Sequence, residues 1–245
     1  MQVDYSIQYA KWHDNSPEHY AESARFYGDL LAPVLQTLDK SSRILDVGCG
    51  TGLLVYALRN LGYANVEGID LSPQQIEASC AAGLPCTLVD DPYLERRAAT
   101  EPGSLDAVFL MDVLEHVPVA SQMVFVGAIS RLLKSSGRLV ISVPNANSSF
   151  AARWRYIDWT HCSAFTEHSL EFVVKNQGFK QVTYFPYEYG ERPRFPYFHR
   201  PSFWTWLLRR AVRGFRRLEA IGEFGRQGLQ MPLSLNLLAV CRKAE

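Results

Sequence analysis

Short apolar runs alternate with helical stretches along the middle of the chain. The apolar runs cover residues 43–48, 65–70, 85–90, 105–112 and 137–144, and two further runs follow at 181–189 and 233–242. Hydrophobic positions recur with helical spacing at 53–61, 73–81, 119–134 and 166–177, where Thr166 predicts an N-cap and Gly178 a stop. Such alternation is typical of a parallel sheet that helices cover on both faces. The pattern therefore predicts a doubly wound α/β domain.

Three segments lie outside this alternation. Residues 1–39 predict an N-terminal helical region whose helix, over 16–38, is interrupted by Pro33. Residues 145–165 form a loop rich in Arg, Trp and Tyr. Residues 191–232 separate the last two strands and are too many for a hairpin loop, so we expect helices within them. All three belong to a single domain that spans residues 1–245.

The composition is that of an ordinary soluble protein, with 47% hydrophobic and 20% charged residues. The five cysteines contain no CxxC pair, which argues against a disulfide framework or a zinc site. The first residues lack the layout of a signal peptide, and no run of about 18 apolar residues exists. These features predict a cytoplasmic location.

The first apolar strand leads directly into a glycine-rich turn, DVGCGTG, at residues 46–52. Glycines permit unusual φ values and a close approach of ligand to backbone, and the helix that follows offers unpaired N–H groups. The spacing is GxGxG, whereas the dinucleotide fingerprint is GxGxxG. An acid two residues before the first glycine suits a cationic ligand and would repel a pyrophosphate. The turn therefore favours S-adenosylmethionine (SAM), which carries an ammonium group, over NAD.

Carboxylates end the next two strands. Asp70 comes 18 residues after Gly52, where a ribose diol is expected to bind. Asp90 and Asp91 end the third strand, and one of them is expected to accept the exocyclic amine of an adenine. Acids at successive strand ends around one turn indicate a nucleoside site.

The ordered segments DVGCGTG, GIDLS, LDAVFLMDVLEHVP and LLKSSGRLVISVPN resemble the motifs of class I SAM-dependent methyltransferases over residues 40–180. The resemblance implies SAM as cofactor and a Rossmann-like sheet of seven strands in the order 3-2-1-4-5-7-6, with strand 7 antiparallel. It implies that the cofactor is bound by Asp46, Gly48, Cys49, Gly50 and Gly52 around the methionine, by Asp70 at the ribose, by Leu71 and either Asp90 or Asp91 at the adenine, and by the backbone of Met111.

An LEHV element at 114–117 and a THCSAFT element at 160–166 resemble a subgroup that methylates quinone precursors, small natural products and sugars of cell-surface polysaccharides. The stretch DWTH at 158–161 looks most like the polysaccharide-associated members. We therefore expect O-methylation of a sugar or phosphosugar, free or lipid-linked, in glycan synthesis. A quinone precursor or another small aromatic is the alternative acceptor. A module that binds SAM or a nucleotide without turnover is the alternative from another class.

His161 is the candidate general base, because an imidazole titrates near neutrality, and Asp158 is expected to orient it. The alternative is that His161 bonds to backbone and shapes the loop. His116 is interpreted as a capping or packing residue. No cluster of Asp, Glu and His has the spacing of a metal site, so we expect no metal ion.

Tyr5, Tyr9, Trp12 and His13 lie close together near the N-terminus. They predict either a lid that excludes water from the cofactor or a helix packed on the sheet edge. The sequence leaves both interpretations open.

Residues 202–221 predict an amphipathic helix. The chain is acidic over 1–150, with 10 Lys or Arg and 17 Asp or Glu, and basic over 151–245, with 15 and 8. The helix either lies on an anionic membrane surface, at the inner face of the membrane, or packs its apolar half on the body. No RNA-binding motif accompanies the arginines, so no nucleic acid partner is expected. One half of the helix carries Phe203, Trp204, Leu207, Leu208, Ala211, Val212, Phe215, Leu218 and Ile221, and the other carries Arg209, Arg210, Arg213, Arg216, Arg217 and Trp206.

Overall fold

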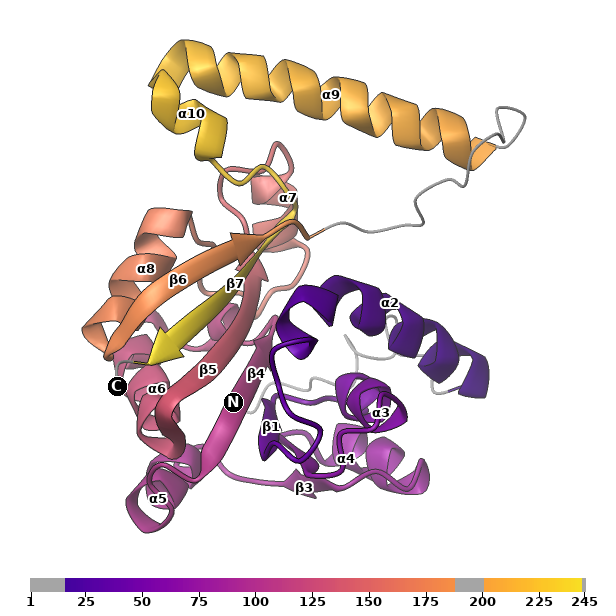
Figure 1. Cartoon of the computed structure of the whole chain (residues 1–245), viewed down its shortest axis with the longest axis vertical. Coiled ribbons are helices and arrows are strands. Elements are labelled where there is room, and N and C mark those ends of the chain that lie inside the picture. The colour runs from indigo at the N-terminus through magenta and orange to yellow at the C-terminus, as the bar shows by residue number, and fades with distance from the viewer. Residues whose placement is uncertain (1–15, 188–200, 244–245) are drawn as a thin grey trace.

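A seven-stranded sheet forms the centre of the molecule (Figure 1). The computed structural model describes residues 16–187 and 201–243. Its strands are β1 (Ile44–Val47), β2 (Val66–Asp70), β3 (Cys86–Leu88), β4 (Leu105–Met111), β5 (Leu133–Pro144), β6 (Phe179–Phe185) and β7 (Asn236–Lys243). Their order is β3-β2-β1-β4-β5-β7-β6, and β7 runs antiparallel to both of its neighbours. The predicted Rossmann-like fold and strand order are confirmed.

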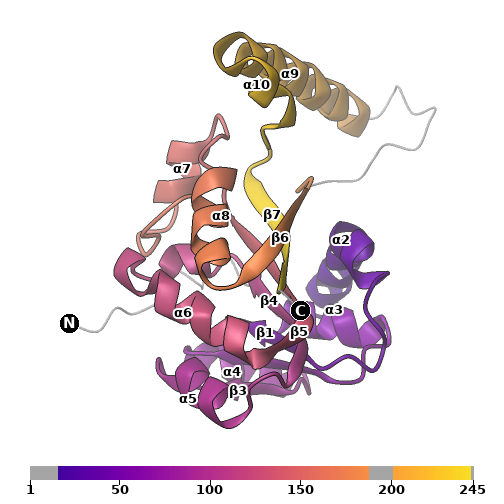
Figure 2. The same cartoon turned by 60° about the vertical axis from the view of Figure 1, so that its left-hand side comes forward.

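Helices cover both faces of the sheet, and each face has its own hydrophobic core (Figure 2). One face carries α2 (Pro17–Leu35), α3 (Leu53–Asn60) and α4 (Pro73–Ala81). The other carries α5 (Tyr93–Thr100), α6 (Val119–Leu132) and α8 (Glu167–Asn176). The five parallel strands β1 to β5 therefore end at one edge of the sheet, where α/β proteins bind ligands.

The element boundaries differ from the sequence pattern in three places. Helix α2 runs through Pro33 without interruption and ends two residues later, at Leu35. Strand β5 begins at Leu133, four residues earlier than predicted, since Leu133 pairs with Leu105 ahead of a register shift. Helix α5 was not predicted: it has only eight residues, and only Leu94, Arg97 and Ala98 are buried.

Short helices occupy the segments that follow β4 and β5. The 3₁₀ turn η1 (Leu114–His116) follows β4, and α7 (Ala151–Tyr156) lies within the predicted acceptor-side loop. The predicted lid residues Tyr5, Tyr9, Trp12 and His13 lie outside the described residues. The described part of the N-terminal region is α2, which packs against α3.

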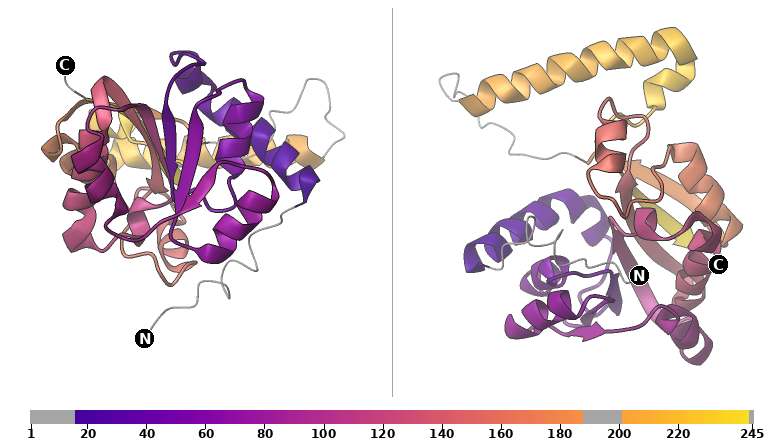
Figure 3. Two further views of the ribbon diagram at one scale, coloured as in Figure 1. Left: turned by 90° about the horizontal axis from the view of Figure 1, so that it is seen from below. Right: turned by 180° about the vertical axis from the view of Figure 1, so that it is seen from behind.

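The predicted insertion contains α9 (Pro201–Phe224) and α10 (Arg226–Gln230), while residues 191–200 lie outside the described part. These helices extend beyond the rest of the molecule, above α7 (Figures 1 and 3). Helix α9 packs mainly against α10. None of the described helices is both long enough and apolar enough to cross a membrane.

Candidate functional site

The glycine-rich turn connects β1 to α3, and each of its glycines adopts a positive φ: 70° at Gly48, 55° at Gly50 and 81° at Gly52. A Cβ at Gly48 would lie 2.5 Å from Val113, and one at Gly52 would lie 2.6 Å from Leu84. The nearest atom to a Cβ at Gly50 is 3.5 Å away. The fold itself therefore requires the first and third glycines, whereas the second leaves a cradle that a ligand fits and a side chain would fill.

Asp70 ties the end of β2 to this turn. Its Oδ2 accepts a hydrogen bond from the backbone N–H of Gly50 at 2.9 Å, and its Oδ1 accepts one from Ser72 at 2.8 Å. An ionised carboxylate has about four lone-pair sites, so two remain for the hydroxyls of a ribose. Asp70 thus lies beside the cradle, as predicted, and also bonds to the backbone of the cradle itself.

Asp46 and Cys49 lie beneath the turn. Asp46 is buried, and burial raises the pKa of its carboxyl well above the ordinary value, with Cys86 and Asp70 adding to the effect. A cationic ligand would offset this unfavourable burial of charge. The side chain of Cys49 is buried against Cys86, so it offers a ligand only its backbone.

The predicted adenine residues lie at the ends of β2, β3 and β4. Leu71 is 56% exposed. Asp90 is bound by both terminal nitrogens of the Arg96 guanidinium, and this hydrogen bonding lowers the pKa of its carboxyl. In the described part of the chain, no hydrogen bond or ion pair engages the carboxylate of Asp91. Met111 is half-buried at the last position of β4. The structure thus brings the predicted cofactor residues to one edge.

Asp112 is a site residue that the sequence reasoning missed. It follows β4 with a φ of 56°, an uncommon conformation for a residue with a side chain. Its Oδ1 accepts hydrogen bonds from Ser142 at 2.9 Å and Asn236 at 2.6 Å, and Asn236 in turn accepts one from Trp154. Burial raises the pKa of Asp112 to about 6. The sequence signal that could have identified Asp112 is an acidic residue directly after β4.

His116 and His161 stand edge to face, with ring centroids 4.7 Å apart. Asp158 does not orient His161 as predicted. Its Oδ1 accepts the hydroxyl proton of Thr160 at 2.6 Å, and Thr160 lies 2.7 Å from Nδ1 of His116. Nδ1 of His161 lies 3.1 Å from the carbonyl oxygen of Trp154 instead. The carboxylate of Asp158 therefore acts through Thr160 on His116, which the sequence analysis interpreted as a capping or packing residue.

Glu115 completes the cluster. Its side chain is buried, and neither carboxylate oxygen has a hydrogen-bond partner among the described residues. One ligand atom each from Glu115, His116 and His161 lies within 4.8 Å of the others. The sequence indicated no such cluster, because spacing along the chain cannot reveal that His161 returns to the end of β4.

Burial dominates the electrostatics of the cluster. It raises the pKa of Glu115 well above the ordinary value, and the nearby Asp112 raises it further. Burial lowers the pKa of His116 to about 4, with His161 adding to the shift, and it also lowers the pKa of His161. Both imidazoles are therefore neutral near pH 7, each with one nitrogen lone pair available.

Gln122 fixes the loop that carries His161. This buried side chain donates from Nε2 to backbone carbonyls at both ends of η1 and to the hydroxyl of Ser163. The N–H of Cys162 donates to the carbonyl of Glu115 at 2.6 Å. These bonds hold the 160–163 stretch against η1, which is how residues 45 positions apart share one site.

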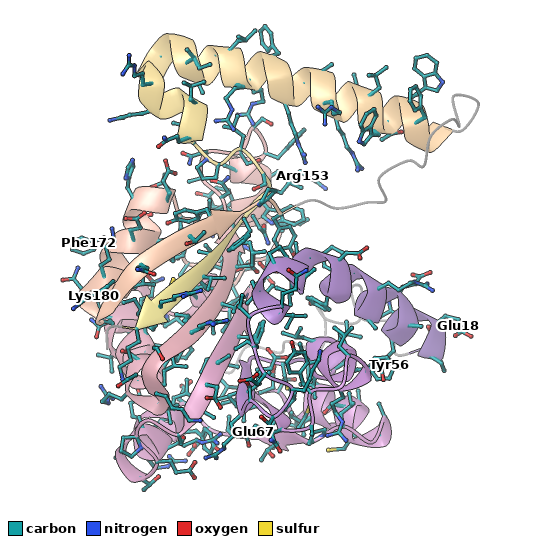
Figure 4. All side chains as sticks on the ribbon, in the orientation of Figure 1. Glu18, Tyr56, Glu67, Arg153, Phe172 and Lys180 are labelled. Atoms are coloured by element: carbon teal, nitrogen blue, oxygen red, sulfur yellow. The ribbon has the colours of Figure 1, made fainter. Side chains whose placement is uncertain are left out.

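The apolar side of α9 faces away from the body. Phe215 is 71% exposed, Leu218 is 68% exposed and Leu208 is 65% exposed. On the opposite side, Arg216 donates to the carbonyl of Asn147, in the loop after β5. Figure 4 shows side chains on both sides of the helix, those on the upper side directed away from the body. The helix does not pack its apolar half on the body, which was one of the two interpretations.

Comparison with known proteins identifies a family that this chain matches. A family model described as a methyltransferase domain matches residues 18–184. A ubiquinone biosynthesis O-methyltransferase of Xanthomonas oryzae pv. oryzae is 41% identical over 107 residues, which are 42% of this chain and 44% of that protein. One of Neisseria meningitidis serogroup C is 32% identical over 140 residues, 56% of this chain and 55% of that protein. The chain thus matches only about half the length of these curated relatives.

Solved structures share the fold at low sequence identity. A SAM-dependent methyltransferase from Archaeoglobus fulgidus has a TM-score of 0.66 at 20% identity, covering 98% of this chain and 100% of that one. A phosphoethanolamine N-methyltransferase of Haemonchus contortus, in complex with phosphomonomethylethanolamine and S-adenosylhomocysteine, has a TM-score of 0.56 at 15% identity, covering 100% of this chain and 61% of that one. At these identities the likeness concerns the fold.

Proposed function

The chain belongs to the methyltransferase domain family, and on that premise we propose that it transfers a methyl group from SAM to a hydroxyl of a small acceptor. The observation that carries the proposal is the juxtaposition, at one sheet edge, of the Gly50 cradle and the Glu115–His116–His161 cluster. The side chain of Val113 links the two, because it contacts Gly48 of the turn and directly precedes η1.

SAM supplies an electrophilic methyl group on a sulfonium. The protein contributes the cradle at Gly50, the buried carboxylate of Asp46 toward the methionine ammonium, and the remaining lone pairs of Asp70 toward the ribose. Leu71 offers an apolar surface to the adenine. His161, at the acceptor side, promotes loss of the hydroxyl proton, and Asp158 positions His116 beside it through Thr160.

Asp91 is the carboxylate that we assign to the adenine amine, because Arg96 already engages Asp90. Asp91→Ala should weaken binding of S-adenosylhomocysteine (SAH) by about tenfold, the usual worth of a hydrogen bond to a charged group. Asp90→Ala is the matched control and should leave affinity unchanged, since it removes only an exposed ion pair. Isothermal titration measures both. An equal loss in the two variants, or a loss in Asp90→Ala alone, would contradict the assignment.

The acceptor is proposed to be a phenolic hydroxyl of a quinone precursor or similar small aromatic. Both curated relatives reported above carry ubiquinone biosynthesis in their names, which supports this acceptor over the sugar or phosphosugar hydroxyl suggested by the DWTH stretch. The acceptor-side loop also carries three exposed aromatic side chains, those of Phe150, Tyr156 and Trp159. Aromatic rings stack favourably on such side chains.

Transfer of tritium from methyl-labelled SAM tests this function. A prenylated dihydroxybenzoate and a nucleotide sugar are offered separately to the full-length protein, with SAH formation as a second readout. The proposal expects label in the aromatic acceptor and none in the sugar. Label in the sugar alone would restore glycan methylation, and label in neither, together with normal SAH binding, would favour a module without turnover.

We also propose that α9 lies on an anionic bilayer. Its outward side presents large apolar side chains, and α9 carries five Arg and two Glu, a net charge of +3. Arg209, Arg210 and Arg213 are exposed, whereas Arg216 and Arg217 bond to backbone carbonyls of the body and of α10. A helix with an apolar outer side and arginines on its other half suits the boundary between headgroups and acyl chains. The location would then be peripheral to the inner face of the membrane.

Vesicle sedimentation tests the membrane proposal. The wild-type protein should sediment with anionic vesicles more than with neutral ones and should dissociate as salt rises, because each arginine near the surface contributes about 1 kcal/mol that salt screens. Changing Leu208, Phe215 and Leu218 to Ser should abolish sedimentation without lowering the melting temperature, since all three are exposed.

The matched control removes similar apolar area from the body. Leu88, Val124 and Phe172 are also exposed, and Phe172 lies at the outer side of α8 (Figure 4). Changing these three to Ser should leave sedimentation intact. If the wild-type protein stays in the supernatant with anionic vesicles at low salt, α9 is not a membrane helix.

A further inference from the structure

We propose that Cys49 and Cys86 form a peroxide-sensitive thiol pair, whose disulfide distorts the cofactor cradle and weakens binding of SAM. Cys49 lies in the glycine-rich turn, and Cys86 is the first residue of β3. Both are free thiols in the structure. The chemistry of the pair is independent of the acceptor, whereas its effect on the protein rests on the proposed cofactor site.

Gly68 of β2 brings the two sulfurs together. Its Cα is the partner of the Cα of Cys86 in the parallel ladder between β2 and β3. A Cβ on Gly68 would lie 2.8 Å from Sγ of Cys49 and 2.9 Å from Sγ of Cys86. The two sulfurs therefore share the space that a side chain at this position would fill, and the thiols form a hydrogen bond with each other.

This hydrogen bond makes the two thiols differ in acidity. It lowers the pKa of Cys86, although burial opposes that shift, and it raises the pKa of Cys49, with burial acting in the same direction. The carboxylates of Asp46 and Asp70 raise the pKa of Cys49 further, and Asp70 also opposes ionisation of Cys86. Cys86 is therefore the sulfur that reacts with an oxidant, and Cys49 is the neighbouring thiol that resolves the product.

Burial decides which oxidant reaches the pair. Cys49 is 8% exposed and Cys86 is 7% exposed, so a molecule close to water in size is required. Sγ of Cys49 lies 3.7 Å from the carbonyl oxygen of Gly50, which places the thiol directly beneath the cradle. A ligand bound in the cradle should cover the thiol and slow its oxidation.

Hydrogen peroxide is an oxidant of suitable size. The thiolate of Cys86 attacks one peroxide oxygen: an S–O bond forms, the O–O bond breaks, and the departing hydroxide takes up a proton to become water. The sulfur of Cys49 then loses its proton and attacks the sulfenic acid. The S–S bond forms as the S–O bond breaks, and the hydroxyl leaves with that proton as water. The thiols lose two electrons, which the peroxide accepts.

The disulfide moves the glycine-rich turn. Nonbonded atoms in contact lie about 3.5–4.0 Å apart, whereas bonded sulfurs lie about 2.05 Å apart. Closing this gap draws Cys49 toward β3, which its ladder to β2 holds in place. The next residue along the turn is Gly50, whose N–H donates to Asp70 at 2.9 Å. Displacement of the turn therefore alters the cradle and its bond to the carboxylate that is assigned to the ribose.

Peroxide treatment of the full-length protein tests the pair. Peptide mapping without reduction should find a Cys49–Cys86 cross-link, and thiol titration in denaturant should show the loss of two of the five thiols. Isothermal titration should show that the oxidised protein binds SAH at least about tenfold more weakly, the usual worth of a hydrogen bond to a charged group. Dithiothreitol should restore the affinity, and saturating SAH present during treatment should slow cross-linking.

Cys86→Ser removes the reacting sulfur. This variant should bind SAH as the reduced wild type does, and peroxide should not change its affinity. The matched control carries both Cys80→Ser and Cys162→Ser, which remove two exposed thiols and leave the pair intact. It should lose SAH affinity on oxidation to the same extent as the wild type. Circular dichroism verifies that each variant is folded.

Three results would overturn the proposal. They are the absence of a Cys49–Cys86 cross-link in the oxidised wild type, normal SAH affinity in the cross-linked protein, and an equal loss of affinity in oxidised, folded Cys86→Ser. The mapping result needs no variant. Failure of the proposed function gives a different result: the reduced wild type would bind no SAH, while a mapped cross-link would still establish the thiol pair.

Discussion

Replacing His161 with Ala should lower kcat by about 10²–10⁴-fold while the affinity for SAH stays within about twofold of the wild type. The imidazole lies beside His116 and bonds to the backbone of Trp154, on the acceptor side of the site. The cradle at Gly50 is formed by other elements, so loss of the ring should not alter cofactor binding. The expected loss reflects removal of the group that promotes loss of the acceptor's hydroxyl proton.

Single-turnover methyl transfer with saturating SAM, combined with SAH titration, measures the effect of this change. The matched control is His168→Ala, which removes an exposed imidazole and should leave both quantities unchanged. A fall in kcat of less than about tenfold in a folded His161→Ala variant would limit His161 to shaping its loop.

Gly50→Val should weaken SAH binding by more than about 100-fold, which corresponds to about 2.7 kcal/mol. A valine side chain would enter the space above the turn, where no atom of the described residues lies within 3.4 Å of a Cβ. The positive φ of 55° adds strain of about 1–2 kcal/mol for a residue with a Cβ, which should lower the melting temperature.

Gly62→Val separates these two effects. Gly62 has a φ of 89° and nothing within 4 Å of a Cβ, so its substitution brings similar backbone strain away from the cradle. It should lower the melting temperature to a similar extent and leave SAH affinity unchanged. Normal SAH affinity in Gly50→Val would mean that the cofactor does not bind over this glycine.

Local motifs were the part of the site that the sequence could predict. The order of apolar runs fixes the parallel strands, and parallel strands bring their ends to one edge. Asp46, the glycine turn and Asp70 could therefore be placed together without coordinates. The functions of Gly48 and Gly52 were less visible, because their contacts come from Val113 and Leu84, far along the chain.

Contacts between distant segments were not predictable in this way. Glu115 and His161 meet because Gln122 and backbone bonds hold a loop against η1, and no periodicity encodes that approach. The partner of Asp158 was mistaken for the same reason: the sequence places His161 three residues away, but the fold puts Thr160 and His116 in line with the carboxylate.

Helix α9 illustrates a different limit. Helical periodicity separates its apolar half from its arginines, but it does not say which half faces the body. That choice depends on hydrogen-bond acceptors elsewhere in the chain. The carbonyl oxygen of Asn147 accepts a hydrogen bond from Arg216, and two carbonyl oxygens that follow α9 in the chain accept hydrogen bonds from Arg217. The apolar half therefore turns outward.

Isothermal titration of the wild-type protein with SAH and, separately, with NAD tests the central claim most directly. The glycine turn with its GxGxG spacing, the buried Asp46 and the carboxylate of Asp70 predict one SAH site per chain with a dissociation constant in the micromolar range or below, about −8 kcal/mol or stronger, and no heat with NAD. Binding of NAD without binding of SAH would contradict the account.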